Sequence, residues 1–207
     1  MHIAKTYRAG IWIPLLLALP AAAEPARSAS AVIDSLHEEL LDVMKHAVEL
    51  GYEGRAARLE PVVQEHYDVS FMASKSVGRY WKSASDAERA AFLAAFLRFM
   101  VANYAGQFDG YSGQTFTTLG EEPARMDTVL VKSRLGNPDG DDVDLNYRMR
   151  LVDGQWRIID VYLDGTVSEL ALRRSEFSGI VKRENFDALI AAIDERVAEL
   201  ASGKDDS

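Results

Sequence analysis

Residues 143–165 constrain the possible folds more than any other stretch of this 207-residue chain. Apolar and polar residues alternate strictly over residues 143–151, which predicts a strand with one buried face. Asp153-Gly154 follows, and this pair tolerates the positive φ values of a type I′ turn. Residues 155–163 then predict the returning strand, so the stretch as a whole indicates an antiparallel hairpin.

The returning strand carries apolar residues on both of its faces. One predicted face holds Trp156, Ile158 and Tyr162, and the other holds Ile159, Val161 and Leu163. A strand that is covered on both faces lies in the interior of a fold. We therefore expect other elements to pack over each side of this strand.

The first 23 residues predict a secretory signal peptide rather than a part of the fold. Lys5 and Arg8 give a basic leader, residues 11–19 form a short apolar run, and the alanines at 21–23 supply small residues at the cleavage positions. The apolar run is about half of the ~20 residues that cross a bilayer. We expect residues 24–207 to form one domain in a bacterial periplasm, where a sizeable core replaces the disulfides that a cysteine-free chain cannot make.

The charge balance excludes one class of partner. The chain has 23 basic and 32 acidic residues, and removal of Lys5 and Arg8 makes the remainder more acidic still. Nucleic-acid binding requires clustered lysine and arginine, which this chain does not show. We expect no nucleic-acid partner and a monomeric protein.

The part of the chain that follows the signal peptide begins with patterns that predict helices. Apolar residues recur at helical spacing over residues 32–48, which predicts a helix that Ser30 caps and Gly51 ends. A second helical piece starts near Gly54, and Pro61 suits the first turn of a further helix. The run Ser85-Asp86-Ala87-Glu88 is a capping box for the longest helix.

The order of the elements predicts the fold class. Residues 114–119 and 128–135 read as strands that precede the hairpin, and helical spacing returns after Gly165. The chain thus consists of helices, four antiparallel strands and further helices. We expect an α+β fold, with a four-stranded antiparallel sheet packed against a helical layer.

A search for catalytic and metal-binding groups yields few candidates. His37 and His46 are nine residues apart, outside the i, i+4 spacing of two ligands on one helix, so we expect no metal site. The acidic residues between 137 and 144 have an arginine where a calcium loop needs its last glutamate, so they indicate a solvated loop. Asp160 lies among apolar strand residues beside Arg157. It is either a paired structural group or a general base.

Several motifs together resemble the MlaC family of periplasmic phospholipid carriers, also called toluene-tolerance proteins. Their order and spacing span nearly the whole mature chain. The motifs are Tyr67-Asp68, Gly78-Arg79-Tyr80-Trp81, Tyr111-Ser112-Gly113-Gln114, residues 143–149 and residues 155–161.

The resemblance also has a departure. The family pattern continues with Gly-Val-Ser and then Asn-Tyr-Arg, whereas this chain reads Gly165-Thr166-Val167-Ser168 and then Leu172-Arg173-Arg174. This departure is similar to the HpnM branch, which is associated with hopanoid biosynthesis. It leaves open whether the cargo is a glycerophospholipid or a hopanoid-type lipid.

The resemblance implies a carrier that holds lipid tails in an apolar cavity between sheet and helices and exchanges them with membrane-anchored transport complexes on either side of the periplasm. It implies no cofactor besides the bound lipid. The aromatic stripe of the longest helix and the apolar face of the hairpin are the candidate lining, although such a stripe is usually core. The candidates for tail contact are Phe71, Val77, Tyr80, Phe92, Phe96, Met100, Tyr104, Val129, Val131, Leu145, Tyr147, Met149, Trp156, Ile158 and Val161.

Two other functions remain open from the sequence. One is a small periplasmic hydrolase or isomerase with Asp160 as general base and Tyr147 as electrophile. The other is a scaffold protein of an envelope complex. A lipid-sized apolar cavity favours the carrier, whereas a small pocket with polar groups around Asp160 favours the enzyme.

Overall fold

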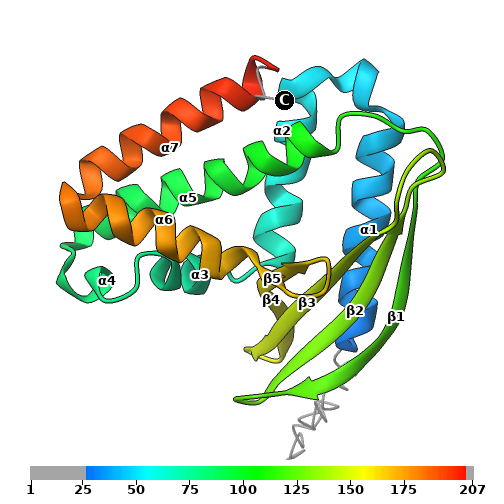
Figure 1. Ribbon diagram of the computed structural model, residues 1–207, viewed down its shortest axis with the longest axis horizontal. Coiled ribbons are helices and arrows are strands. Elements are labelled where there is room, and N and C mark those ends of the chain that lie inside the picture. The colour runs from blue at the N-terminus through cyan, green and yellow to red at the C-terminus, as the bar shows by residue number, and fades with distance from the viewer. Residues whose placement is uncertain (1–26, 204–207) are drawn as a thin grey trace, which may run out of the picture.

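The computed structural model describes residues 27–203, which form the expected α+β fold (Figure 1). Helices precede and follow an antiparallel sheet. The elements in chain order are α1 (Ala29–Lys45), α2 (Ala47–His66), α3 (Val69–Ser76), α4 (Tyr80–Ser83), α5 (Asp86–Gln107), β1 (Thr115–Ala124), β2 (Thr128–Gly136), β3 (Val143–Val152), β4 (Gln155–Leu163), β5 (Val167–Ser168), α6 (Glu169–Arg183) and α7 (Phe186–Ala201).

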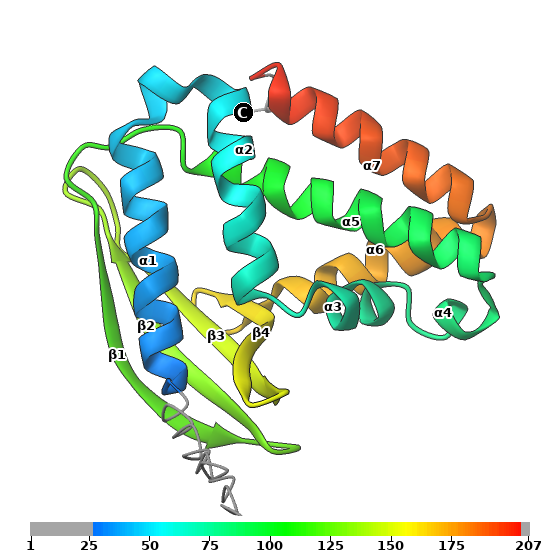
Figure 2. The same ribbon diagram turned by 180° about the vertical axis from the view of Figure 1, so that it is seen from behind.

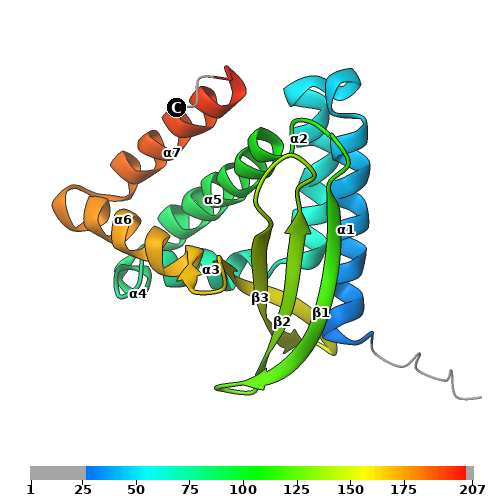
Figure 3. The same cartoon turned by 45° about the vertical axis from the view of Figure 1, so that its right-hand side comes forward.

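The sheet is a meander in the order β1-β2-β3-β4-β5. The prediction of four strands omitted β5, which is only two residues long and leads directly into α6. Figure 2 shows α1 lying along one face of β1 and β2, and Figure 3 shows the opposite face of these strands in front of that helix. Helices α5, α6 and α7 lie to one side of the sheet, and α2, α3 and α6 contact β4.

The hairpin of β3 and β4 has the predicted turn, because Asp153 and Gly154 both have positive φ values of 50° and 79°. The predicted assignment of faces in β4 is wrong. Met149 pairs with Ile158 but Arg148 pairs with Asp160, so Ile159 is the extra residue of a β-bulge. The bulge brings Ile158 and Val161, which strict alternation separates, onto the same side of the sheet.

Two predicted details of the first helices are also wrong. The side chain of Ser28, rather than Ser30, caps α1 by accepting from the backbone N–H of Ala31. Ser30 instead donates its N–H and hydroxyl to Glu121 of β1. Helix α2 continues through Pro61, and its departure from helical geometry lies instead at Gly51, whose φ is 59°.

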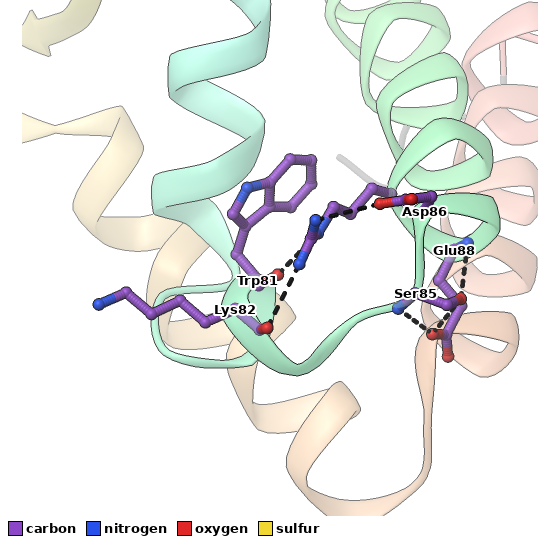
Figure 4. A network of polar contacts seen from close by, with 6 residues as sticks. Trp81, Lys82, Ser85, Asp86 and Glu88 are labelled. Atoms are coloured by element: carbon purple, nitrogen blue, oxygen red, sulfur yellow. Dashed lines mark hydrogen bonds and ion pairs between the residues drawn. The ribbon is translucent and has the colours of Figure 1, made fainter.

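The predicted capping box at the start of α5 is confirmed, with the Ser85 side chain and the Glu88 carboxylate each bonded to the other's backbone N–H (Figure 4). The adjacent Arg89 donates to the carbonyl oxygens of Trp81 and Lys82. These bonds hold α4 against the first turn of α5, and thereby position the aromatic residues that follow.

The helical layer has its own core around Phe92. This ring contacts four other aromatic rings, with centroid distances between 5.8 and 6.4 Å; they belong to Trp81, Phe96, Phe177 and Phe186. Within residues 27–203, no helix is long and apolar enough to cross a membrane.

Candidate functional site

An apolar cavity lies where the sheet, α5 and the start of α6 meet. Its volume is about 130 Å³. Helix α5 supplies the largest share of the lining, and β3, β4, the first two turns of α6 and the junction of α2 with α3 supply the rest. Cavities that hold drug-sized ligands measure ~300–1,000 Å³, and a dry cavity of ~150 Å³ holds a benzene ring. In this conformation the cavity therefore has room for a small group of carbon atoms, not for whole acyl chains.

The structure brings six of the predicted lining residues together around this cavity. They are Phe96, Met100, Tyr104, Leu145, Tyr147 and Val161. Phe96, Met100 and Tyr104 follow one another at four-residue spacing on α5, so they share a face of that helix. Leu145 and Val161 share a face of the sheet with Tyr147, since Val161 pairs with Tyr147 across β3 and β4.

The other nine predicted residues do not line the cavity. Five are filled core: Val77, Phe92, Val131, Met149 and Ile158. Four are half-buried at the periphery: Phe71, Tyr80, Val129 and Trp156. Phe71 lies beneath the guanidinium of Arg150, and Tyr80 lies beneath that of Arg79. An apolar residue on a predicted buried face can thus belong to either the core or the cavity lining, and the sequence pattern alone did not distinguish the two.

The sequence analysis missed ten lining residues. They are Tyr67, Met72, Phe99, Asn103, Gln107, Phe108, Leu163, Glu169, Leu170 and Arg173. Helical spacing was a usable signal for Phe99, Asn103 and Gln107, because they continue the face of Phe96 and Met100 along α5. Period-two alternation was a usable signal for Leu163, because this residue shares the predicted face of the candidate Val161 and pairs with Leu145 across β3 and β4.

Three tyrosine side chains give the cavity wall a polar component. The hydroxyls of Tyr67 and Tyr104 contact each other, and the hydroxyl of Tyr147 lies 3.2 Å from His37 Nε2. Burial raises the pKa of all three tyrosines, that of Tyr104 to about 12, so each remains neutral. Their hydroxyls act as hydrogen-bonding groups in an otherwise apolar wall.

His37 supports Tyr147 from the side of α1. Its ring stacks on Phe116 of β1 with a centroid distance of 4.3 Å, and only 4% of the residue is exposed. Burial lowers the pKa of His37 to about 4, with Asp34 acting in the opposite direction. A neutral imidazole therefore stands behind the cavity wall at physiological pH.

The first two turns of α6 form a charged edge of the cavity. Glu169 and Arg173 both line it, and Arg173 Nη2 lies 3.4 Å from Glu169 Oε2. Arg173 Nη1 also donates to Glu176 Oε2 at 2.9 Å, and the guanidinium lies 5.0 Å from the centre of the Phe99 ring. The cavity thus combines an apolar interior with one pair of opposite charges at its edge.

Asp160 does not line the cavity, and it is not paired with Arg157. Its Oδ2 accepts from the Ser168 hydroxyl at 2.6 Å, and its Oδ1 accepts from the backbone N–H of Leu170 at 3.0 Å. Both oxygens of this buried carboxylate therefore hold the start of α6 against β4. This is the arrangement of a structural group rather than of a general base.

The remaining candidates form no site in the part of the chain that the structure describes. No group of three acidic, histidine or cysteine side chains among residues 27–203 is arranged to hold a metal ion. His37 lies within α1, and His46 stands at the break between α1 and α2. Asp142 and Asp144 belong to the turn and start of β3, where Asp144 pairs with Arg134.

Comparison with known proteins places this geometry in a family. A sequence model of the family described as MlaC protein matches residues 34–195. The chain belongs to the MlaC family. The matched range contains every residue that lines the cavity.

A solved structure has the same fold. It is the phospholipid-binding protein from Ralstonia solanacearum in complex with a phospholipid, which is similar with a TM-score of 0.74 and 22% sequence identity. The alignment covers 84% of this chain and 99% of the Ralstonia protein. This likeness establishes that the arrangement of sheet and helices in the present MlaC protein is the arrangement found in the Ralstonia structure.

Proposed function

We propose that this MlaC protein is a periplasmic lipid carrier, which holds the tails of a phospholipid or a hopanoid-type lipid between its sheet and its helices. The observation that carries the proposal is the apolar cavity between α5 and the hairpin of β3 and β4. Membership of the MlaC family supports it, as does the phospholipid bound to the Ralstonia protein of the same fold.

The energetics explain why such a carrier is needed. Two acyl chains expose on the order of 30 methylenes to water, each at a cost of ~0.8 kcal/mol, so an unaided crossing of the periplasm is prohibitive. A carrier offsets this cost by shape and burial alone. No covalent step is required, and we propose that the protein is not an enzyme.

Loading requires the cavity to widen, since about 130 Å³ does not hold two acyl chains. The lining contains flexible side chains, notably Met72 and Met100, which can rearrange at low cost. We propose that the sheet moves away from α5 as the tails enter. Exchange with membrane-anchored complexes of the inner and outer membranes would supply and remove the cargo.

Native mass spectrometry tests the proposal most directly. The protein is purified from its own periplasm without detergent, weighed as the intact complex, and then extracted with organic solvent to identify the bound molecule. We expect about one diacyl or hopanoid-type lipid per chain, on a chain that begins near Glu24. Recovery of a folded protein that carries no lipid, and that takes up none from liposomes, would contradict the carrier function.

A further inference from the structure

The two charged residues at the cavity edge have a geometry suited to a ligand. Arg173 and Glu169 keep 30% and 29% of their side chains exposed while they also line the cavity. Among the described residues that line the cavity, Arg173 is the only one with a positive charge and Glu169 the only one with a negative charge. When the apolar part of a ligand enters the cavity, its polar part lies at the cavity edge. There it meets the charged side chains of Arg173 and Glu169.

Arg173 is held firmly while donors of its guanidinium remain for a ligand. The Phe99 ring lies beneath it, and Glu176 accepts from Nη1 at 2.9 Å, a normal length for a charge-assisted bond. The contact of Nη2 with Glu169 is longer, at 3.4 Å. A guanidinium has five N–H donors, so a phosphate can bind to Arg173 without displacing Glu176.

The start of α6 does not compete for the same phosphate. The backbone N–H groups of the second and third residues of this helix are already bonded, because Leu170 donates to Asp160 and Ala171 donates to Ser168. The Asp160 carboxylate at this point also repels an anion. A phosphate at the cavity edge therefore has Arg173 as its cationic partner.

The charges around Arg173 favour a headgroup that is itself neutral overall. Two carboxylates, Glu169 and Glu176, flank one guanidinium, so an anionic headgroup without a cation meets a net negative surrounding. The chain as a whole adds to this, with a formal net charge of −9. A zwitterionic headgroup instead brings an ammonium that can pair with Glu169 while its phosphate binds Arg173.

From this geometry we infer that Arg173 and Glu169 form a headgroup subsite which selects zwitterionic phospholipids, with the phosphate on Arg173 and the ammonium on Glu169. The inference rests on the proposed carrier function. It assigns to Arg173 a role in the choice of cargo.

Competition between lipids with identical acyl chains tests the inference. Delipidated protein is incubated with vesicles of equimolar phosphatidylethanolamine, phosphatidylglycerol and diacylglycerol, and the bound species are counted by native mass spectrometry. Partly exposed ion pairs contribute up to ~1 kcal/mol, so we expect the wild type to prefer phosphatidylethanolamine to phosphatidylglycerol by about fivefold. Glu169→Gln should bring this ratio close to one, and Glu169→Lys should reverse it.

Arg173→Gln should abolish the preference for phosphatidylethanolamine over diacylglycerol, which has no phosphate. Lys182→Gln is the matched control, because Lys182 is an exposed residue on the same helix that does not line the cavity. Circular dichroism verifies the fold of each variant. If Arg173→Gln does not fold, the two Glu169 variants still test whether the headgroup subsite exists.

The possible failures are distinguishable. A wild type that binds lipid with a ratio that neither Glu169 variant changes would overturn the headgroup subsite and leave the carrier function intact. A wild type that takes up none of the three lipids would overturn both.

Discussion

Helix α5 contributes aromatic residues to two regions that differ in how completely they are filled. Around Phe92, near the start of the helix, rings from α4, α6 and α7 pack against it, and Phe92 itself is fully buried. One turn later Phe96 borders the cavity, and Met100 and Tyr104 continue its wall. The same helix thus has a filled core at one end and a space at the other.

The difference originates in the partner elements rather than in α5. Helix α6 places Phe177 against Phe92, Phe96 and Phe99, whereas its first two turns offer only Leu170 and the charged pair Glu169 and Arg173. On the sheet side, the cavity is lined by Leu145 and Tyr147 of β3 and by Val161 and Leu163 of β4. The aromatic face of α5 therefore belongs to the core where rings of other helices pack against it. It lines the cavity where no such rings do.

The largest loss of stability should come from removing the ring at the centre of the filled region. Phe92→Ala should lower the free energy of unfolding by ~3–5 kcal/mol, because it deletes a fully buried ring among four others. Urea denaturation measures the loss. Lipid bound per folded chain should stay at the wild-type level; a stable variant that has lost its lipid would mean that Phe92 belongs to the cavity.

The next largest effect should be a loss of stability at low pH, which originates from His37 behind the cavity wall. The pKa of His37 is about 4 in the folded protein because of burial, against 6.5 in the unfolded chain. The unfolded state therefore binds the proton more readily, so stability is full above pH 6.5 and falls as the pH drops toward 4. The shift corresponds to about 3 kcal/mol at most.

His37→Gln is the variant that isolates this contribution, because glutamine cannot be protonated in this range. Thermal unfolding measured from pH 7 to pH 4 should show a shallower loss of stability in the variant than in the wild type. His46→Gln is the control, since His46 is exposed and its side chain bonds within its own helix end. Equal pH dependence in all three proteins would contradict the assignment to His37.

A matched pair of valines makes the comparison sharper. Val131 and Val161 flank Tyr147 from the two neighbouring strands on the same face of the sheet, but only Val161 lines the cavity. Val131→Phe should overpack a filled region and cost ~1–3 kcal/mol. Val161→Phe should cost less, because its ring can enter the cavity, yet it should reduce lipid binding.

Two measurements on each valine variant check this pair: urea denaturation, and lipid content after incubation with liposomes. The expected pattern is a destabilised Val131→Phe that still binds lipid when folded and a stable Val161→Phe that binds little. The reverse pattern would show that the space beside Val161 is not where the tails lie.

The smallest expected effect concerns the bond between sheet and helix beside the cavity. Asp160→Asn should lower the free energy of unfolding by ~1–2 kcal/mol, because an amide replaces a carboxylate that accepts from Ser168 and Leu170. Lipid transfer between labelled liposomes, measured on folded protein, should persist. A well-folded variant that binds lipid but has lost all function would instead support the enzyme with Asp160 as its base.

The sequence alone determined the elements with strong local signals. Strict alternation in residues 143–151 and the Asp153-Gly154 turn predicted the hairpin, and the capping box at Ser85 and Glu88 predicted the start of α5. These signals are local, because a turn type, a helix cap and a period of two each depend on a few adjacent residues. The fold class followed from the order of the elements along the chain, and the MlaC family from the resemblance of several motifs, which the family match confirms.

Only the tertiary structure decided which of the apolar residues line the cavity. The bulge at Ile159 moved Val161 and Leu163 onto the inner face, and nothing in the strand's own residues marks a bulge. The function of Asp160 and the position of Arg173 likewise depend on α6 folding back onto β4 and toward α5. A space exists where elements distant in sequence fail to fill the volume between them, and no local pattern records that volume.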